Sequence, residues 1–373
     1  MVEKISQKLI GGRVRAAREV KGWTQDQLAQ GLGLNDRQSV SDIENGKRAL
    51  RPDEMLSISD LLDRDVEFFI DPFAVGGEAQ FSWRAAPEVP EDSLNGFELK
   101  AGQWIGLFRW LREQQGSRAS VLKRALRLSA QSTYEDAQRH AERLVIELDL
   151  GIIPAEGLID KIERELDIPV LFVDTVDASN GQSISGATCH LNEMGLILIN
   201  RNEGEARRFF NLAHELFHAL TWDAMQPDHR ESNSIEDRNK GKRLEQLAHN
   251  FAAALLMPRA SLDSLIDKNR AIDIGHLCEV AAKLRVAPVT LAWRLFNLKL
   301  INEDTRLGLS QQKQRKTASS PPKRFSPTFV KMLHEALENG RLSARKAAKA
   351  MGLGLGGLTA LFAEYDLAAP FEL

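Results

Sequence analysis

The residues of this chain whose types and spacing could do chemistry lie in segment 209–220, FFNLAHELFHAL. His214 and His218 are four residues apart, so both imidazoles lie on one face of a helix and can reach one metal ion. Glu215 projects beside that ion, where a carboxylate can take a proton from water attacking a carbonyl. The rest of the helix is apolar, so these three polar groups would be costly to bury unless they held something. The segment therefore predicts a hydrolytic zinc site. The apolar residues are Phe210, Leu212, Ala213, Leu216, Phe217 and Leu220.

A catalytic zinc ion usually takes three protein ligands, so a third must be found. Thr221 and Ala224 stand where a metzincin would have Gly and His, which excludes that class. Segment 243–258, RLEQLAHNFAAALLMP, predicts a second amphipathic helix, and Glu245 lies within its apolar pattern. We favour Glu245 as the third ligand. His249, one turn later, is an alternative ligand, a hydrogen-bond donor to the transition state, or a group that supports a ligand.

Together these two stretches resemble the ImmA/IrrE metallopeptidases, bacterial and phage proteins that cleave or relieve helix-turn-helix repressors. The resemblance rests on NLAHELFHAL followed by E-x-x-A-x-N-F-A-A-A-L-L-M-P and covers about residues 131–305. It implies that His214, His218 and Glu245 hold zinc and that Glu215 is the general base.

Two positions depart from the family pattern. Phe217 stands where the family usually has Gly, which predicts a more crowded cleft. His249 stands where the family has Asn, and this leaves open which group stabilises the oxyanion.

Composition bounds the rest of the molecule. The 373 residues, 43% hydrophobic and 27% charged, suffice for two or three compact domains. A net charge of −3 gives no global attraction to nucleic acid, so DNA affinity must come from a local patch. The two cysteines form no CxxC pair, and no apolar run approaches membrane-spanning length. A reducing cytoplasm, without membrane contact, is the expected location.

Residues 1–72 predict a series of short helices. Thr24 begins a capping box, Asn35 or Asp36 can cap a helix over 37–44, and Val40 and Ile43 face inward. The outward residues of that helix are the donors and acceptors that a major-groove reader needs, with further polar and basic residues placed to hold phosphates. The expected DNA contacts are Gln25, Arg37, Gln38, Ser39, Ser41, Asp42, Lys47 and Arg48.

This N-terminal segment resembles the Xre or Cro/C1-type helix-turn-helix domain through GRVRAAREVKGWTQDQLAQGLG and SVSDIENGKR. The resemblance implies that Arg18 and Glu44 form a structural ion pair. The turn GLNDRQSVS is one residue longer than the common form, so the base-contacting positions are uncertain by one. We expect a double-stranded DNA operator and a homodimer to bind it. A protein-binding use of the same fold remains the alternative.

The remaining chain divides by composition. We predict a helical connector over 73–130 with a tryptophan-bearing helix from Trp104, the peptidase domain over 131–305, a flexible basic linker over 306–326, and a small helical module over 327–373. Strands are expected over 168–173, 185–190 and 195–200. By analogy with related peptidases, one strand would bind extended substrate backbone.

The sequence as a whole thus predicts a mainly α protein with a small sheet: an all-α helix-turn-helix domain, an α+β zincin-like peptidase domain and a helical C-terminal module. The expected function is a DNA-binding regulator fused to a zinc endopeptidase. Its substrate would be a repressor, an antitoxin or the chain itself, in a stress or mobile-element response. The alternative is an antitoxin or repressor of a toxin-antitoxin operon whose zinc fold binds a toxin, or senses a signal, without cleaving.

Overall fold

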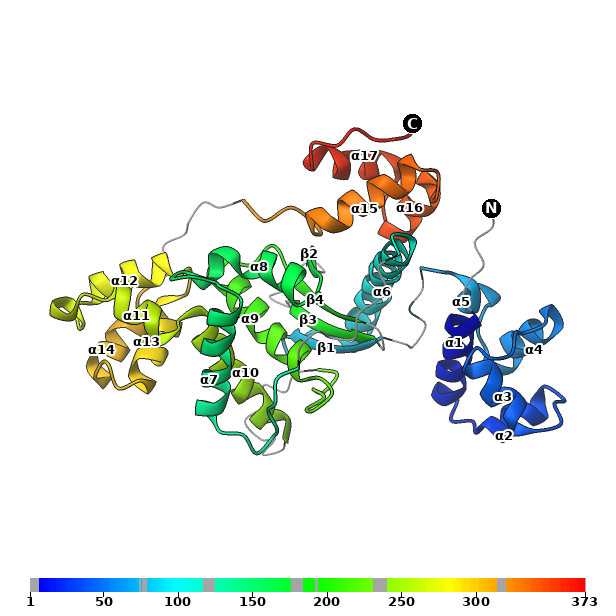
Figure 1. Ribbon diagram of the computed structural model, residues 1–373, viewed down its shortest axis with the longest axis horizontal. Helices are drawn as coiled ribbons and strands as arrows, with labels where there is room; N and C mark the ends of the chain where they lie inside the picture. Colours follow the sequence, from blue (N-terminus) through cyan, green and yellow to red (C-terminus); the bar gives the residue numbers. More distant parts are fainter. Residues whose placement is uncertain are drawn as a thin grey trace. The chain divides into compact units, whose positions relative to one another are not determined.

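The computed structural model describes residues 7–73, 75, 79–116, 125–175, 184–191, 194–230, 240–313 and 320–372. Over these residues the chain forms seventeen α-helices, one short 3-10 helix and one four-stranded sheet (Figure 1). The predicted class, mainly α with a small sheet, is confirmed. The chain divides into two compact units, each made of discontinuous segments. Unit 1 comprises 1–80, 94–119 and 328–373, and unit 2 comprises 81–93 and 120–327.

The N-terminal part of unit 1 is a bundle of five short helices. Thr24 caps the second helix in a capping box with Gln27, and Asp36 caps the third by accepting from the Ser39 amide at 2.7 Å. Apolar residues from all five helices, Val40 and Ile43 among them, form a common core. The helices are α1 (Gln7–Val20), α2 (Gln25–Gly31), α3 (Arg37–Glu44), α4 (Pro52–Leu62) and α5 (Val66–Ile70).

Arg18 and Glu44 form the predicted structural ion pair between α1 and α3. The Arg18 Nε atom lies 2.6 Å from Glu44 Oε1, and Glu44 is 3% exposed. This pair therefore holds the helix-turn-helix fold together from inside.

The rest of unit 1 is built from the tryptophan-bearing helix and the C-terminal module. The long helix α6 (Glu91–Gln114) begins well before the predicted start at Trp104. Trp104 is buried and donates from Nε1 to the Met351 carbonyl at 3.2 Å, while the rings of Phe108 and Phe329 lie 5.5 Å apart. Trp104 therefore serves core packing. The C-terminal helices are α15 (Pro327–Glu338), α16 (Ala344–Met351) and α17 (Leu355–Glu364).

Unit 2 contains the sheet, in the order β1-β3-β4-β2. Three strands match the predicted ones: β2 (Val170–Val173), β3 (Ile184–Leu191) and β4 (Met194–Asn200). β2 runs parallel to β4, with Val170 opposite Ile197, and β3 runs antiparallel to β4. The fourth strand, β1 (Gln80–Ala85), lies in the segment that the sequence predicted as a connector. It forms the sheet edge next to β3.

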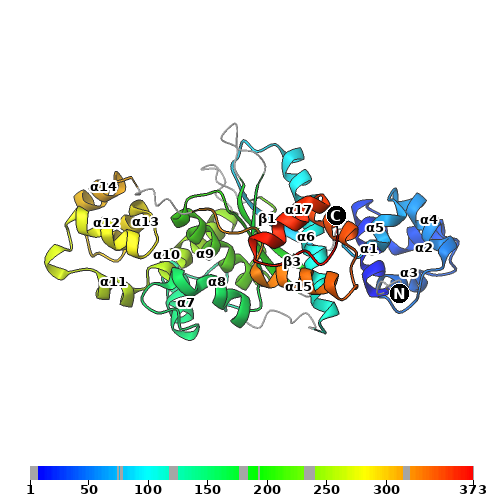
Figure 2. The same cartoon turned by 90° about the horizontal axis from the view of Figure 1, so that it is seen from above.

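Helices surround this sheet and supply the core of unit 2. The helix α9 (Glu205–Thr221) packs on β3 and β4, and α10 (Lys240–Leu256) packs on α9 and on α7 (Tyr134–Glu147). Figure 2 shows α11 to α14 as a group at the end of unit 2 away from the sheet. The other elements are α8 (Pro154–Glu165), α11 (Arg259–Leu265), the 3-10 helix η1 (Lys268–Arg270), α12 (Ile274–Lys283), α13 (Pro288–Asn297) and α14 (Glu303–Ser310).

The described parts of the predicted flexible linker, 306–326, are ordered. Its first residues belong to α14, while residues 314–319 lie outside the described part of the chain. Phe325 is 1% exposed, and its amide donates to the Phe172 carbonyl of β2 at 2.9 Å. Arg324 pairs with Asp174 at 3.3 Å. The prediction of a solvated tether is wrong for these residues because one buried aromatic and one ion pair anchor them to β2.

Candidate metal centre and DNA interface

The predicted ligands converge between α9 and α10. The Nε2 atoms of His214 and His218 lie 3.0 Å apart. Glu245 Oε2 lies 3.1 Å from His214 Nε2, and Glu245 Oε1 lies 3.5 Å from His218 Nε2. Both histidines are fully buried and Glu245 is 9% exposed. Two imidazoles and one carboxylate form the donor set of a catalytic zinc site, so these residues fit the ion. Within the described part of the chain, no other group of three such donors comes together.

Burial and charge favour the ligand forms of these groups. Burial lowers the pKa of His214 well below its usual range, and the nearby Arg84 charge lowers it further. Burial raises the pKa of Glu245, but the adjacent His218 and His214 outweigh this and bring it to about 2. A neutral imidazole and an ionised carboxylate are the states that bind a metal cation.

Glu215 lies on the sheet side of α9, where β3 holds it. Thr188 of β3 donates its hydroxyl to Glu215, whose Oε2 and backbone carbonyl oxygen lie 2.7 and 2.9 Å away. A Cβ atom at Gly186, also on β3, would lie 3.6 Å from Glu215 Cγ and 2.8 Å from the Leu198 carbonyl oxygen. The small residue therefore permits the close approach of β3 to β4, while a Cβ atom would be in ordinary contact with Glu215.

His249 follows the predicted ligand Glu245 by one turn of α10. Its ring centre lies 4.9 Å from that of His214 and 5.8 Å from that of Phe210. A residue that sequence reasoning missed also reaches this point: Arg84 of β1 approaches His249 with its Nη2 atom 3.1 Å from Nε2. No local motif marks Arg84, because only the pairing of β1 with the sheet brings it here.

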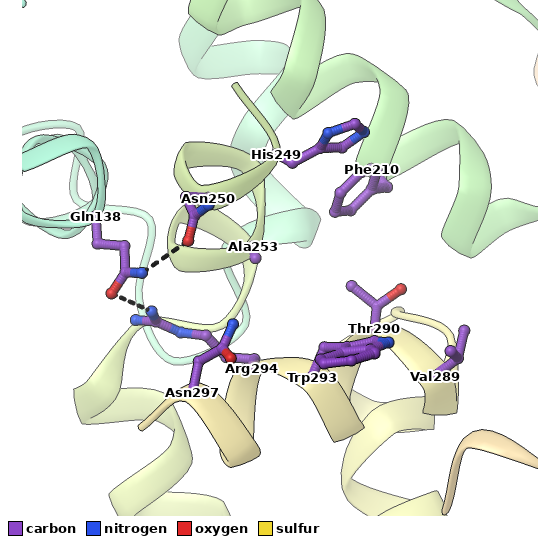
Figure 3. A pocket seen from close by; sticks show the side chains of 10 residues that line it. All are labelled: Gln138, Phe210, His249, Asn250, Ala253, Val289, Thr290, Trp293, Arg294 and Asn297. Carbon is purple, nitrogen blue, oxygen red and sulfur yellow. Dashed lines mark hydrogen bonds between the residues drawn. The ribbon is translucent and has the colours of Figure 1, made fainter. Parts of the chain in front are cut away.

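A pocket of about 230 Å³ opens beside His249 (Figure 3). Phe210, Ala253, Val289 and Trp293 give it apolar walls. Gln138 joins polar residues at one end, donating to Asn250 Oδ1 at 2.9 Å and accepting from Arg294 Nη1 at 2.8 Å. The remaining lining residues are Thr290 and Asn297. The pocket contacts the metal centre through His249 and lies between α10 and α13.

The expected DNA contacts lie on and around α3. Arg37 and Gln38, at its start, are exposed, and Ser39, Ser41 and Asp42 are half-buried. Gln38 donates to Asp42 Oδ1 at 2.9 Å, so these two side chains present a joint polar surface.

Two of the residues expected to hold phosphates have protein partners. Gln25 donates to Glu44 at 2.8 Å and accepts from Arg37 at 3.1 Å. Arg48 forms an ion pair with the buried Glu54 at 2.5 Å. Lys47, by contrast, is exposed on the turn after α3. The geometry thus favours Lys47 over Arg48 for a phosphate contact.

Comparison with known proteins assigns two segments of the chain. Residues 14–69 match the helix-turn-helix family, and residues 164–296 match the IrrE N-terminal-like domain. No curated protein matches the chain. No helix among the described residues is long and apolar enough to cross a membrane.

Two solved structures align over most of the chain. Both are apo forms of the competence regulator ComR. The structure from Streptococcus vestibularis is 13% identical in sequence, and the match covers 94% of this chain and 100% of that one. The structure from S. thermophilus is 11% identical, and the match covers 96% of this chain and 95% of that one. Their TM-scores of 0.17 are too low to inform fold or function. The two family matches, together with the fold and the site, show that this chain joins an Xre-type helix-turn-helix domain to an ImmA/IrrE-like peptidase domain and is a DNA-binding regulator with a peptidase-like domain.

Proposed function

We propose that this protein is a transcriptional regulator whose second unit is a zinc-dependent endopeptidase. The observation that carries the proposal is the convergence of His214, His218 and Glu245 beside a carboxylate, Glu215, that Thr188 holds in place. A structural zinc site needs no such carboxylate, whereas hydrolysis of a peptide bond needs a general base next to the ion.

The residues have separate tasks in this reaction. When bound to the two histidines and Glu245, zinc would polarise the scissile carbonyl and make the attacking water more acidic. Glu215 takes the proton from that water and passes it to the leaving nitrogen. The Thr188 hydroxyl orients the carboxylate by donating to Oε2.

The pocket beside the centre supports a proposal for the class of substrate. Its apolar walls and its volume of about 230 Å³ suit one aliphatic or aromatic side chain next to the scissile bond. We therefore propose as substrate a protein with a hydrophobic residue in an extended segment. A repressor, an antitoxin or this chain itself would meet that requirement, in a stress or mobile-element response.

On the DNA side, we propose that α3 enters the major groove and that two copies of the chain bind a two-fold operator. Arg37, Gln38, Ser39, Ser41 and Asp42 face the bases. Cleavage of a partner would then be coupled to transcription through the same polypeptide.

The experiment is mass spectrometry of the purified protein after co-expression with the proteins encoded beside it, comparing wild type with Glu215→Gln. The variant keeps all three zinc ligands, so equal zinc content in both proteins is the control. A fragment present only with wild type establishes the protease and identifies its substrate. Cleavage that survives in Glu215→Gln refutes the assigned mechanism.

A second function is favoured by one observation, the occlusion of the centre. His214, Glu215 and His218 have no exposed surface, and Phe217 packs against Phe251 with ring centres 5.4 Å apart. A site closed in this way suits an antitoxin or repressor that uses the zinc fold to bind a partner or sense a signal without cleavage. Zinc-loaded protein that retains a neighbour on purification and produces no fragment would favour this alternative.

A further inference from the structure

Arg84 reaches the metal centre from a strand with a fixed position. The Trp83 amide donates to the His229 carbonyl at 2.9 Å, and Ser82 donates its hydroxyl to the Asp228 carbonyl at 2.8 Å. Trp83 and Ala85, the neighbours of Arg84, are 0% and 3% exposed. Side chains alternate along a strand, so burial of these neighbours directs Arg84 to the opposite face. The backbone that carries Arg84 is therefore fixed by these bonds to residues 228 and 229 and by its place in the sheet next to β3.

The contact between Arg84 and His249 determines the tautomer of the imidazole. A guanidinium has five N–H donors and no acceptor, so the His249 Nε2 atom, 3.1 Å from Arg84 Nη2, must accept the hydrogen bond. The ring proton then lies on Nδ1. His249 consequently cannot use Nε2 to donate to a carbonyl oxygen while this contact is made.

The positive charge lies one imidazole away from the ligands. His249 packs on His214 with ring centres 4.9 Å apart, and its Nε2 atom lies 3.1 Å from Arg84 Nη2. Peptide hydrolysis develops negative charge on the carbonyl oxygen, and a preorganised cation or donor near that oxygen stabilises the transition state.

We propose that Arg84 is the donor to the oxygen of the scissile carbonyl and that His249 is the residue that positions it. This inference rests on the proposed peptidase function and deepens it. The sequence left the oxyanion role open, with His249 as one candidate, and the proposal assigns it to a residue outside the segment that matches the IrrE N-terminal-like domain. The same guanidinium would bind other tetrahedral oxyanions at the centre, which permits a test without a substrate.

The test measures the binding of inorganic phosphate to the full-length, zinc-loaded protein by ³¹P NMR. Arg84→Met removes the donors but keeps the length of the side chain, and we expect at least a tenfold weaker affinity, about 1.4 kcal/mol. Arg84→Lys, which keeps the charge, should weaken binding less. His249→Asn keeps an acceptor for Arg84 and should change the affinity less than threefold. Arg143→Met, at an exposed ion pair on α7, is the matched control and should leave binding unchanged.

Several outcomes would overturn the proposal. The first is that the wild-type protein binds no phosphate, and the second is that Arg84→Met binds it normally. The third is that His249→Asn loses as much phosphate affinity as Arg84→Met. Zinc content and the thermal midpoint are measured for every variant, and Arg84→Lys replaces Arg84→Met in the comparison if the latter does not fold. Phosphate binding that depends on Arg84, in a protein that cleaves nothing, would contradict the proposed peptidase function while supporting the anion site.

Discussion

Glu245 is the residue on which the metal centre most depends. Its carboxylate lies within 3.5 Å of both histidines and has little contact with solvent. Glu245→Gln keeps the shape of the side chain but removes the anionic ligand. Loss of a group that only orients a ligand lowers metal affinity by roughly 10- to 100-fold, so we expect Glu245→Gln to lower zinc affinity by more than this. Thr188→Val is the matched control, since Thr188 contacts Glu215 and no ligand. Competition with a chromophoric chelator measures both affinities, and equal losses would contradict the assigned ligand set.

We expect Glu54 to confer acid sensitivity on the helix-turn-helix bundle. Its burial raises its pKa, but hydrogen bonds from Arg48 and the Arg51 amide outweigh this, and the net shift is downward. A carboxylate whose folded pKa is lowered stabilises the fold above its unfolded pKa, and this stabilisation is lost as pH falls through the folded value.

Glu54→Gln should therefore lower stability by about 1 kcal/mol at neutral pH and by progressively less below about pH 4.5. Thermal midpoints of the two proteins between neutral pH and about pH 3 provide the measurement. A difference that is constant over the whole range would show that the ion pair contributes nothing.

At the scale of elements, two adjacent glycines of α1 have opposite roles. A Cβ atom at Gly11 would lie 2.1 Å from the Ile43 carbonyl oxygen of α3, whereas one at Gly12 would meet nothing within 4 Å. We expect Gly11→Ala to destabilise unit 1 by about 2–3 kcal/mol through overpacking. Gly12→Ala should stabilise it by about 0.5–1 kcal/mol because alanine loses less conformational entropy in a helix. Urea unfolding of both variants tests the α1–α3 contact, and similar effects of the two substitutions would exclude it.

We expect the turn after α3 to offer one basic residue to DNA rather than two. Lys47→Ala should weaken DNA binding about equally for all sequences. It should also reduce the magnitude of the slope of log K against log salt concentration by about 1, as expected for one lost phosphate contact. Arg48→Ala should chiefly lower stability, because Arg48 is paired with Glu54. Fluorescence anisotropy at several salt concentrations distinguishes the two residues, and an unchanged slope for Lys47→Ala would remove it from the interface.

The helices could be predicted from sequence because their signals are local. The apolar period of α9 and α10, the Thr24 capping box and the four-residue spacing of His214 and His218 all lie within single elements. β1 was not predicted, because the alternation of apolar and polar residues over 81–85 is short and its partner β3 lies about a hundred residues later. Arg84 was missed for the same reason. Phe325 likewise becomes a buried contact only through its pairing with β2.

At the scale of the whole molecule, the chain passes between its two units four times, at residues 80–81, 93–94, 119–120 and 327–328. All donors of the metal centre nevertheless belong to unit 2. Zinc at the proposed site would bind only the folded form of that unit, so we expect it to stabilise that unit by about 2.7 kcal/mol when its free concentration is 100 times Kd. The bundle formed by α1 to α5 contains none of these donors.

Zinc removal by a chelator should therefore lower the thermal midpoint of unit 2 while the helix-turn-helix bundle keeps its own. Two tryptophans report the units separately, Trp23 beside α2 and Trp222 at the end of α9. Fluorotryptophan labelling of the intact chain, read by ¹⁹F NMR, gives the two unfolding curves with and without chelator, and Glu245→Gln, already poor in zinc, should show no further shift. If both curves shift equally, the two units unfold as one cooperative body, which their four covalent connections would explain. Loss of zinc at the centre would then destabilise the DNA-binding fold directly, and the metal could regulate transcription without any cleavage.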